Sequence, residues 1–506
     1  MTIAYCSTRA DDPQDADNAD NADQQRADES TAGGGNSTAG GNSTAGEGGA
    51  SQAGPGFADV LLAGPAPDGG LYCPVEIPPL PDLDHLGPDA GYAEIATEVM
   101  WPYVEGSVER STFADLVEQS YQGFRHPDVV PLIDLGDNHH LLDLTQGPTL
   151  AFKDIALQLV GRLLDHELTR RDGDAVVITA TSGDTGSAAI EALAGRNNVS
   201  AVVLHPHNRV SEVQRRQMTT VSADNIENLA VEGTFDDCQD LVKAAFADPA
   251  LAQSCHLAAV NSINWARVMA QIVYYVVAAR RVAAPGAPVS FTVPTGNFGN
   301  VLAAWYARRM GLPIDQLVVA SNRNDVLTRY FESGELAAAE VMPSLSPSMD
   351  IQVSSNFERV LWEASGRDGA AVAAVIAAFR ADGRVVVPEA WTKMIRSEFD
   401  SGRVDDDETL EEICRVHEEL GLLIDPHTAV GLRVARARRR NHDIPMITVA
   451  TADPAKFPEA VEQATGVRPP LPPFLSELFD RHERFDVVAN DLGVIAARLR
   501  ARAQRA

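Results

Sequence analysis

One lysine of this sequence lies where its amine could become reactive. Lys153 follows a turn-forming segment, 147–152, and precedes the apolar stretch 155–164, whose pattern predicts a helix. A buried ammonium is unfavourable, so a lysine in such a setting loses its charge or finds a partner. A desolvated amine with a lowered pKa can attack an aldehyde and form an imine. The alternative is an ordinary surface lysine whose ammonium reaches water from the start of a helix.

A second candidate site is a loop between a predicted buried strand, 289–293, and a helix that begins near Val301. The loop consists of Pro294, Thr295, Gly296, Asn297, Phe298, Gly299 and Asn300. Two glycines allow the backbone to approach a ligand closely, and a helix N-terminus adds partial positive charge. This loop is therefore predicted to hold a phosphate group without a lysine, although an ordinary strand-to-helix turn has the same pattern.

Polar residues also follow the predicted strand 175–180. Thr181, Ser182 and Asp184 belong to a Thr-Ser-Gly-Asp-Thr-Gly segment that opens a helix rich in small residues. Hydroxyls and free backbone N–H groups at such a place can hold a carboxylate or a phosphate. A helix start that is merely well capped gives the same residue types, so the pattern alone does not decide between the two.

Two more segments could complete a binding site. Asn261 and Ser262 lead into a helix that has Arg267 one turn from its start, and an arginine there can hold a phosphate through two hydrogen bonds. The alternative for Arg267 is a surface side chain on a capped helix. Thr451, at the end of the last predicted strand, offers a neutral hydroxyl that suits a heterocyclic nitrogen, although a threonine there is usually just a cap.

Taken together, these segments fit one cofactor. Pyridoxal phosphate requires a lysine that can form an imine, a cradle for its phosphate and a partner for its ring nitrogen. The sequence offers Lys153, the loop 294–300 and Thr451 for these three tasks. Neither a GxxxxGK[ST] segment nor a GxGxxG segment follows a predicted strand, so a nucleotide cofactor fits less well.

The elements that must position these residues alternate between strand and helix. Strand patterns occur at 130–135, 140–144, 175–180, 199–205, 229–231, 289–293, 316–320 and 446–451. Helical patterns occur at 92–103, 112–123, 211–221, 236–246, 264–284 and 405–423. This alternation predicts an α/β fold with parallel or mixed sheets covered by helices on both faces. Ligands of such sheets bind beyond the carboxyl ends of the strands, where the candidate residues lie.

Length and charge limit the possible classes of protein. With 506 residues, of which 45% are hydrophobic, the chain is long enough for two or more domains with sizeable cores. A formal net charge of −30 disfavours nucleic acids and anionic membranes as partners, and it means that an anionic substrate needs locally focused positive charge. No run of about 18 apolar residues occurs, so no membrane-spanning helix is predicted.

The N-terminus and the cysteines indicate the compartment. The chain does not open with a basic segment followed by an apolar stretch, so no signal peptide is predicted. The five cysteines are scattered and contain no CxxC pair, which favours a reducing environment and argues against a zinc ribbon or a disulfide framework. We therefore predict a cytoplasmic protein without a metal site.

Residues 10–56 interrupt the globular pattern. They are acidic at first and then rich in Gly, Ser, Thr and Asn, with two overlapping copies of one short repeat at 34–46. Such a segment cannot bury enough apolar surface to offset the entropy lost on ordering. We predict a disordered insertion, which is more often a tolerated loop than a docking arm for a partner.

The same residues resemble the threonine synthase family, in particular its longer branch with a dedicated N-terminal domain. The matching segments, in chain order, are Ser7-Thr8-Arg9, Ala66-Pro67-Asp68-Gly69-Gly70-Leu71, Gly147-Pro148-Thr149-Leu150-Ala151-Phe152-Lys153-Asp154, Thr179-Ala180-Thr181-Ser182-Gly183-Asp184-Thr185-Gly186, Asn261-Ser262-Ile263-Asn264, Pro294-Thr295-Gly296-Asn297-Phe298-Gly299, Ser348-Met349-Asp350 and Ser355-Asn356-Phe357-Glu358-Arg359. The resemblance covers nearly the whole chain except the insertion.

The resemblance implies a fold and a domain organisation. The fold would be type II of the pyridoxal-phosphate enzymes, with parallel or mixed sheets in large and small domains, as in the β subunit of tryptophan synthase. An N-terminal domain would span 1–130 and contain the insertion. The catalytic region would span 131–470, and a helical tail would span 471–506.

The resemblance also implies the reaction and the partners. The family converts O-phospho-L-homoserine and water into L-threonine and phosphate, the last step of threonine biosynthesis, by γ-elimination and β-addition of water. The partner would thus be a small molecule rather than a nucleic acid or a membrane, and the chain would act as a monomer or a homodimer.

Residue roles follow from the matching positions. Lys153 would carry pyridoxal phosphate, the loop Gly296 to Asn300 would hold its phosphate, and Thr451 would face its ring nitrogen. Asp184 stands where relatives often have an asparagine near the ring hydroxyl, and Asp453 stands where a histidine is often found. The substrate phosphate would be held by Thr181, Ser182, Asn261, Ser262 and Arg267.

Two other functions stay open at this stage. A threonine or serine dehydratase would share the cofactor site but would need no second phosphate site, and the segment 261–267 argues against it. A cofactor-binding protein without turnover is the alternative from another class. The presence of Lys153, Arg267 and Thr451 together argues against that alternative.

Overall fold

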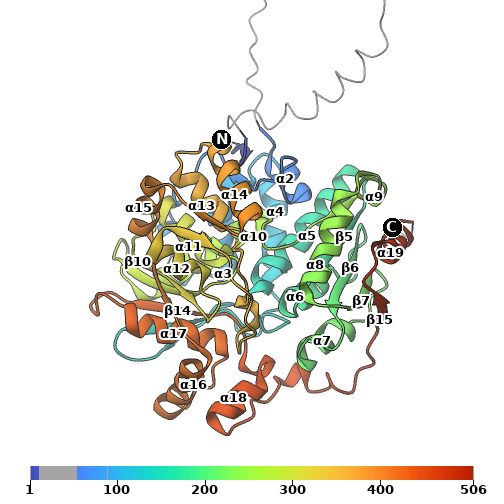
Figure 1. The fold of residues 1–506 in the computed structure, drawn as a ribbon. Helices are drawn as coiled ribbons and strands as arrows, with labels where there is room; N and C mark the ends of the chain where they lie inside the picture. Colours follow the sequence, from blue (N-terminus) through green and yellow to red (C-terminus); the bar gives the residue numbers. More distant parts are fainter. Residues whose placement is uncertain (1, 11–53, 88, 505–506) are drawn as a thin grey trace, which may run out of the picture.

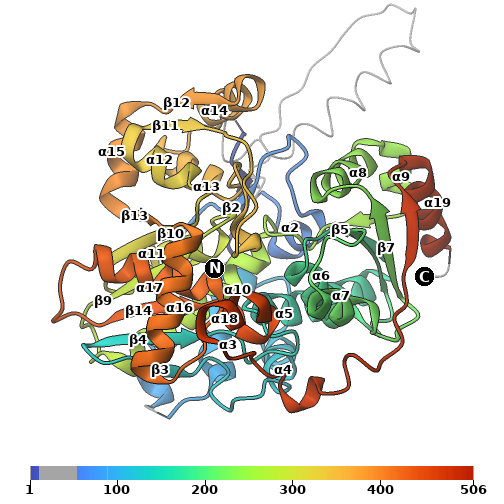
Figure 2. The same ribbon diagram turned by 60° about the horizontal axis from the view of Figure 1, so that its bottom comes forward.

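Two sheets of mostly parallel strands carry the candidate residues, and they lie side by side (Figures 1 and 2). The computed structural model describes residues 2–10, 54–87 and 89–504, so the predicted insertion at 10–56 lies almost wholly outside the described residues. The strands of the six-stranded sheet are, in order, β13 (Asp400–Arg403), β10 (Ile314–Ser321), β9 (Val289–Pro294), β14 (Met446–Ala450), β4 (His139–Asp143) and β3 (Leu132–Asp134). Only the pair β3 and β4 is antiparallel in this sheet.

The second sheet has five parallel strands. In order they are β15 (Asp486–Ala489), β7 (Ile226–Glu232), β6 (Val199–Pro206), β5 (Ala175–Ala180) and β8 (Leu257–Ala258). Alternate side chains of β5 and β6 point to opposite faces, as the period of two in a strand requires. Val177 packs in the main core, whereas Val176 packs on the other face with Leu241 and Ile495. Burial on both faces explains the continuous apolar run of β5.

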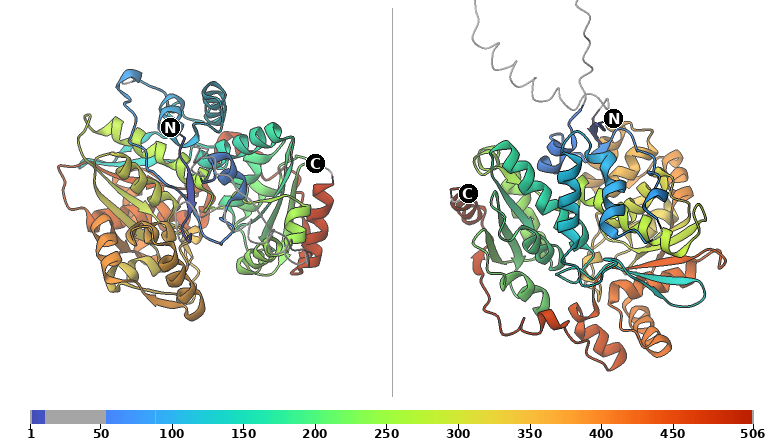
Figure 3. Two further views of the ribbon diagram at one scale, coloured as in Figure 1. Left: turned by 90° about the horizontal axis from the view of Figure 1, so that it is seen from above. Right: turned by 180° about the vertical axis from the view of Figure 1, so that it is seen from behind.

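Helices cover both faces of each sheet. Packing on β5 and β6 are α8 (Phe235–Ala247) and α19 (Leu492–Ala503), which appears in red against the green sheet in both views of Figure 3. On the main-core side of β5 and β6 lie α5 (Lys153–Arg171) and α6 (Asp184–Leu193). The six-stranded sheet is covered by α17 (Pro426–Arg438), which contacts β9, β10, β13 and β14. The predicted α/β class with mixed sheets is therefore confirmed.

Helix α10 (Trp265–Val282) is buried along most of its length. Every residue from Trp265 to Ala279 is buried, because α10 packs between α5, α11 (Gly299–Met310) and α3 (Tyr92–Val104). Such burial on all sides requires the nearly uniform apolar sequence that predicts this helix. Its first turn holds Arg267, so packing of α10 fixes the position of that guanidinium.

The first residues of the chain are tied to the rest by an ion pair. Strand β1 (Tyr5–Ser7) pairs with β2 (Tyr72–Pro74), and helices α2 (Phe57–Ala63) and α4 (Arg110–Tyr121) complete this part. Arg9 donates from Nε and Nη2 to the two carboxylate oxygens of Glu358, at 2.9 and 2.8 Å. The hydroxyl of Thr8 donates to the same carboxylate at 2.7 Å. The Ser-Thr-Arg segment thus anchors the start of the chain to Glu358, about 350 residues further along the sequence.

The sequence does not predict the elements between 326 and 398. They are α12 (Val326–Ser333), β11 (Glu335–Ala337), α13 (Phe357–Ala364), α14 (Gly369–Asp382), β12 (Arg384–Val386) and α15 (Glu389–Glu398). The remaining helices of the two main layers are α7 (Glu212–Thr219), α9 (Pro249–Ser254), α16 (Asp406–Leu420) and α18 (Pro458–Thr465). None of the helices in the described part of the chain is long and apolar enough to cross a bilayer.

A close contact between α5 and α6 sets the spacing of two candidate residues. A Cβ atom at Gly161 of α5 would lie 2.6 Å from the carbonyl oxygen of Ala192 in α6, so only glycine allows this approach. Helix α5 begins at Lys153 and α6 begins at Asp184. The crossing of the two helices therefore holds these side chains at a fixed separation.

Candidate active site

Lys153 is the first residue of α5 and is only 9% exposed. The turn before it is joined to the end of β14. Phe152 donates its backbone N–H to the carbonyl oxygen of Thr451 at 3.0 Å, and Asp453 donates to that of Leu150 at 3.0 Å. These two hydrogen bonds bring the end of the last parallel strand, including Thr451, beside the turn that carries Lys153.

The buried carboxylate of Asp154 stabilises the turn 147–152 that precedes Lys153. Its two carboxylate oxygens accept hydrogen bonds from the backbone N–H and the hydroxyl of Thr149, at 2.8 and 2.6 Å. A Cβ atom at Gly147 would lie 2.5 Å from Oδ2 of Asp154, which explains the glycine at this position. Burial raises the pKa of Asp154 to about 6, although the bonds from Thr149 oppose the rise.

This raised pKa predicts a pH-dependent stability. Because the native pKa of Asp154 exceeds its ordinary value, the native state binds more protons than the unfolded state between about pH 4 and about pH 6. We expect the free energy of unfolding to fall by about 3 kcal/mol across this range, at about 1.4 kcal/mol per pKa unit. In Asp154→Asn this fall should disappear. Urea denaturation of both proteins across this pH range checks the expectation, and a pH-independent difference between them would contradict it.

Asp184 lies at the centre of the site. Its Oδ2 lies 3.3 Å from Nζ of Lys153 and accepts the hydroxyl of Ser348 at 3.0 Å. Its Oδ1 lies 2.7 Å from Nζ of Lys456 and accepts Nε2 of Gln214 at 2.8 Å. Two ammonium groups and two neutral donors therefore share one buried carboxylate.

The charges in this cluster shift the pKa values of its members. Burial lowers the pKa of Lys153, Asp184 opposes the shift, and Lys456 and Arg267 add to it. Burial by itself would raise the pKa of Asp184, but Lys456 and Lys153 hold it well below its usual range. A lysine with a lowered pKa provides more neutral amine at neutral pH, which a nucleophile or a base requires.

The predicted phosphate loop leaves its N–H groups without hydrogen-bond partners in the described structure. The carbonyl oxygen of Gly296 accepts the hydroxyl of Ser354 at 2.7 Å, and that of Asn297 accepts the backbone N–H of Asn356 at 3.1 Å. In a planar peptide the next N–H points opposite to the carbonyl. Within the described residues, the N–H groups of 296–300 have no acceptor. The loop therefore presents free donors at the start of α11, as an anion site requires.

The residues of this loop differ in their contacts and in their burial. Phe298 adopts a φ of 64° and packs its ring against Phe357 and Phe399, with centroids 5.2 and 5.4 Å apart. Asn300 accepts the hydroxyls of two adjacent tyrosines through Oδ1, whereas its buried Nδ2 has no partner in the described structure. Asn297 is exposed. Gly296 has no room for a side chain, since a Cβ atom would lie 2.8 Å from the carbonyl oxygen of Ser348.

Thr181 and Ser182 lie beside Asp184 at the end of β5. The hydroxyl oxygen of Thr181 accepts the backbone N–H groups of Gly183 and Gly186, at 2.9 and 2.8 Å. Thr181 thus caps the start of α6, the alternative that its sequence pattern leaves open. Ser182 is half-buried, and its hydroxyl has no partner in the described part of the chain.

Arg267 is a buried cation without a counter-ion among the residues that the structure describes. It is 3% exposed, and Nη1 donates to the carbonyl oxygen of Val260 at 3.2 Å. Its Nε has no partner, and no carboxylate of the described residues pairs with it. Burial lowers its pKa to about 10. Half-buried Asn261 and Ser262 precede it, and Asn261 accepts the N–H of Ile263 at 3.2 Å. A buried, unpaired guanidinium is typical of an anion-binding site.

The sequence prediction missed several residues of the site. Ser348, besides its bond to Asp184, has its hydroxyl 3.5 Å from Nζ of Lys153, and its backbone N–H donates to Nε2 of His427 at 3.3 Å. His427 in turn contacts Asp425 through Nδ1 at 2.6 Å. Lys456 is fully buried. Lys456 could have been predicted as a site residue from the sequence. It follows the last predicted strand, as Thr451 does, and the chain has only four lysines.

Asp453, whose role the sequence leaves open, supports the segment that carries Lys456. Its Oδ1 accepts the backbone N–H of Ala455 at 2.9 Å and caps the short helix η4 (Pro454–Lys456). Its Oδ2 lies 3.8 Å from Arg125. Burial raises the pKa of Asp453.

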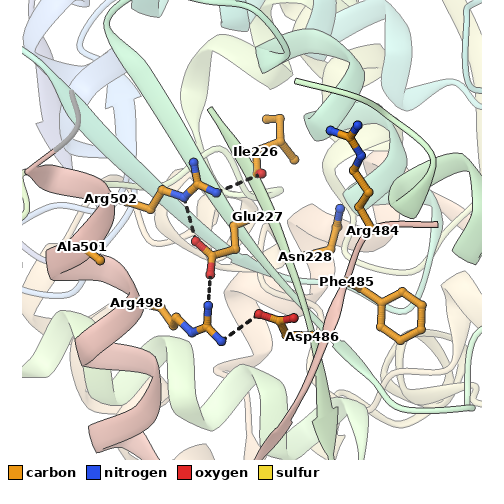
Figure 4. Close-up of a pocket in the computed structure, with 9 residues that line it drawn as sticks. All are labelled: Ile226, Glu227, Asn228, Arg484, Phe485, Asp486, Arg498, Ala501 and Arg502. Carbon is orange, nitrogen blue, oxygen red and sulfur yellow. Dashed lines mark hydrogen bonds and ion pairs between the residues drawn. The ribbon is translucent and has the colours of Figure 1, made fainter. Parts of the chain in front are cut away.

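Two cavities lie away from Lys153. One, of about 270 Å³, is an open pocket that lies between β7, β15 and α19 (Figure 4). Its arginines 498 and 502 already pair with Glu227, at 3.1 and 2.7 Å, so the ion pairs hold the C-terminal segment on the sheet. The other, of about 170 Å³, lies between Arg9 and the segment 352–361. None of the predicted site residues lines either cavity.

Models of known protein families match three stretches of this sequence, and one of these stretches contains most of the site. The model described as pyridoxal-phosphate dependent enzyme matches residues 134–390, which include Lys153, Asp184 and the phosphate loop. The models described as threonine synthase N terminus and threonine synthase, C-terminal match residues 43–121 and 428–498.

Known proteins that align with most of this chain are also threonine synthases. Threonine synthase from Pseudomonas aeruginosa is 53% identical over 445 residues, which cover 87% of this chain and 94% of that protein. Among solved structures, PLP-bound threonine synthase from Brucella melitensis has a TM-score of 0.88 at 43% identity and covers 99% of this chain and 100% of that one. Threonine synthase from yeast has a TM-score of 0.86 at 33% identity, with 99% of each chain covered. The sequence resemblance is confirmed, and the chain belongs to the threonine synthase family of pyridoxal-phosphate-dependent enzymes.

Proposed function

We propose that Lys153, Asp184 and Arg267 carry out the threonine synthase reaction in this chain, the conversion of O-phospho-L-homoserine and water into L-threonine and phosphate. The observation that carries the proposal is the pairing of two features at the strand ends. A lysine of lowered pKa lies 3.3 Å from a buried carboxylate. A buried arginine, which has no counter-ion in the described part of the chain, lies close enough to lower that pKa further.

The residues present fit pyridoxal phosphate. Lys153 would bind its aldehyde carbon, and the free N–H groups of 296–300 would hold its phosphate, with the unpartnered Nδ2 of Asn300 as a further donor. Thr451 lies beside the Lys153 turn and would offer its hydroxyl to the ring nitrogen. When bound, the cofactor supplies an aldehyde for an amine and a conjugated ring that accepts electrons.

The side chains of this protein would handle the protons and the charges. The neutral amine of Lys153 would remove the proton from Cα of the substrate, and its lowered pKa increases the share of the amine that is neutral. Asp184 would stay ionised and orient the amine of Lys153 through the contact at 3.3 Å. Ser348 would orient the same carboxylate oxygen from the other side.

Arg267 would select the substrate. Its guanidinium can donate two parallel hydrogen bonds to a phosphate, and burial strengthens them because water does not compete. We assign Asn261, Ser262, Thr181 and Ser182 as further contacts to the substrate phosphate. A dehydratase has no phosphate on its substrate, so a second anion site beside the cofactor's own favours the phosphorylated substrate.

The domain organisation, compartment and assembly remain the ones expected from the sequence. We propose an N-terminal domain at 1–130, a catalytic region at 131–470 and a C-terminal tail at 471–506. The family models that match residues 43–121 and 134–390 support the first boundary, whereas the model that matches 428–498 spans the second. We also propose that the enzyme acts in the cytoplasm on a small molecule, as a monomer or a homodimer.

The absorbance spectrum of the purified protein, followed by addition of O-phospho-L-homoserine, tests the function. We expect the band of lysine-bound pyridoxal phosphate, and release of phosphate and L-threonine in equal amounts. The band without phosphate release, but with ammonia from serine or threonine, would favour the dehydratase. If added cofactor gives no band, the chain is not a working member of its family.

A further inference from the structure

The chain has four lysines, and two of them meet at one carboxylate. Lys243 and Lys393 are exposed, whereas Lys153 and Lys456 are buried beside Asp184. Lys456 is 0% exposed, which is rare for a lysine and requires a strong partner. Its Nζ lies 2.7 Å from Oδ1 of Asp184 and donates to the carbonyl oxygen of Thr149 at 2.7 Å.

The two lysines contact opposite oxygens of Asp184. Oδ1 receives Lys456 and Gln214, and Oδ2 receives Lys153 and Ser348. The contact of Lys456 is also the shorter, 2.7 Å against 3.3 Å. Loss of the Lys153 contact would therefore leave the other half of the carboxylate fully bonded.

Lys153 is the amine that must change its state. As the proposed carrier of the cofactor and as a base, it is in turn charged, neutral and bonded to carbon. A buried carboxylate whose only cation were Lys153 would lose its counter-ion whenever Lys153 lost its charge, and such a carboxylate would take up a proton instead.

We propose that Lys456 is the permanent counter-ion of Asp184, a positioning residue that keeps this carboxylate ionised and in place while the amine of Lys153 changes its protonation and bonding. Lys456 does not touch the reacting atoms in this role. It acts on Lys153 through Asp184 and through its own positive charge, and this inference rests on the proposed function only in taking Lys153 as the reactive amine.

Electrostatics supports the assignment. Apart from burial, which acts in the opposite direction, Lys456 has the largest influence on the pKa of Asp184, ahead of Lys153. Lys456 also lowers the pKa of Lys153 directly. Removal of this positive charge should therefore raise the pKa of Lys153 and leave less of it neutral at neutral pH.

Other charged groups around the cluster come from four elements. They are Arg267 on α10, which acts on Lys153, His427 on α17, which acts on Asp184, Asp154 on α5, and Asp453 at the start of η4. None of them touches an oxygen of Asp184. Among the residues that the structure describes, substitution of Lys456 therefore removes the only cation besides Lys153 in direct contact with this carboxylate.

Competitive acetylation of the full-length protein, freed of cofactor, tests the proposal without turnover. Peptide mass spectrometry gives the reactivity of Lys153 over a pH series, with exposed Lys243 and Lys393 as internal references. In Lys456→Met we expect the pH midpoint of Lys153 to rise by about one unit or more. The rate at which the protein takes up pyridoxal phosphate at neutral pH should fall about tenfold, in line with the smaller neutral fraction.

Two variants separate charge from structure. Lys456→Arg keeps the positive charge and should keep the midpoint of Lys153 near that of the original protein. The double variant Asp184→Asn with Lys456→Met removes both charges, so its midpoint should stay at or below the original value. Lys393→Met is the matched control on the surface and should change neither the midpoint nor the uptake rate.

Specific results would overturn the proposal. An unchanged midpoint in a folded Lys456→Met protein would mean that Lys456 only ties the Thr149 turn. A rise of equal size in the double variant would mean that the effect does not pass through Asp184. Should Lys456→Met fail to fold, the Arg variant and the double variant still decide. Because labelling requires no substrate, a failure here is distinct from absence of threonine formation, which the phosphate and threonine assay reports.

Discussion

Replacement of Lys153 by alanine is expected to lower kcat by about 10³-fold or more, because it removes both the amine that binds the cofactor and the proposed base at Cα. The band of lysine-bound pyridoxal phosphate should also disappear. Lys456 cannot take over, since it donates to Thr149 and Asp184 and is fully buried. Steady-state phosphate release and the absorbance spectrum check this prediction.

Lys243→Ala is the matched control for that variant. Its ammonium is exposed on α8 and contacts Asp240 at 2.8 Å, away from the site, so kcat and the spectrum should not change. The Lys153→Ala protein should fold, because burial of the Lys153 ammonium is itself unfavourable. A kcat within tenfold of the original value, in a protein that has lost its band, would exclude Lys153 as the base.

Replacement of Arg267 by methionine should lower kcat/KM for O-phospho-L-homoserine by about 10²-fold or more, as loss of a buried charged hydrogen-bonding partner usually does. Cofactor affinity should change far less, because the cofactor phosphate is assigned to the loop 296–300. Methionine approximates the length of the arginine stem and needs no counter-ion, so the melting temperature should not fall. Kinetics, cofactor titration and thermal melting are the measurements.

Arg280→Met gives the matched control, with the same substitution on the same helix. Arg280 lies in the last turn of α10 and donates to the carbonyl oxygen of Gly87 at 3.2 Å. Its loss should leave kcat/KM unchanged. If Arg267→Met weakened cofactor binding and substrate use equally, Arg267 would belong to the cofactor site, and the proposed substrate phosphate site would be wrong.

Local patterns of apolar residues in the sequence were sufficient to predict the helices and strands that are buried on all sides. The prediction of a strand at 175–180 coincides with β5, and the prediction of a helix at 264–284 agrees with α10 (Trp265–Val282) within two residues at each end. Burial on both faces of a strand, or around most of a helix, demands a run of mostly apolar residues, and such runs are visible in the sequence itself.

Two strands at sheet edges, β13 and β15, could not be predicted in this way. Strand β13 reads Asp-Ser-Gly-Arg and has no large apolar residue, yet it pairs with β10 along its full length. Strand β15 lies in the tail 471–506, which was expected to be helical, and it extends the second sheet beside β7. Such strands form because a neighbour offers free backbone groups, and that neighbour is far away in the sequence.

The sequence by itself determined which residues have the chemistry. It singled out Lys153, the loop 294–300, Arg267 and Thr451, because their types and their places at strand ends follow from local order. Only the tertiary structure decided what surrounds them. It placed Lys456 on Asp184 and left Arg267 without a carboxylate among the described residues. Burial and charge pairing set the pKa of a group, and both depend on contacts between segments that are distant in the chain.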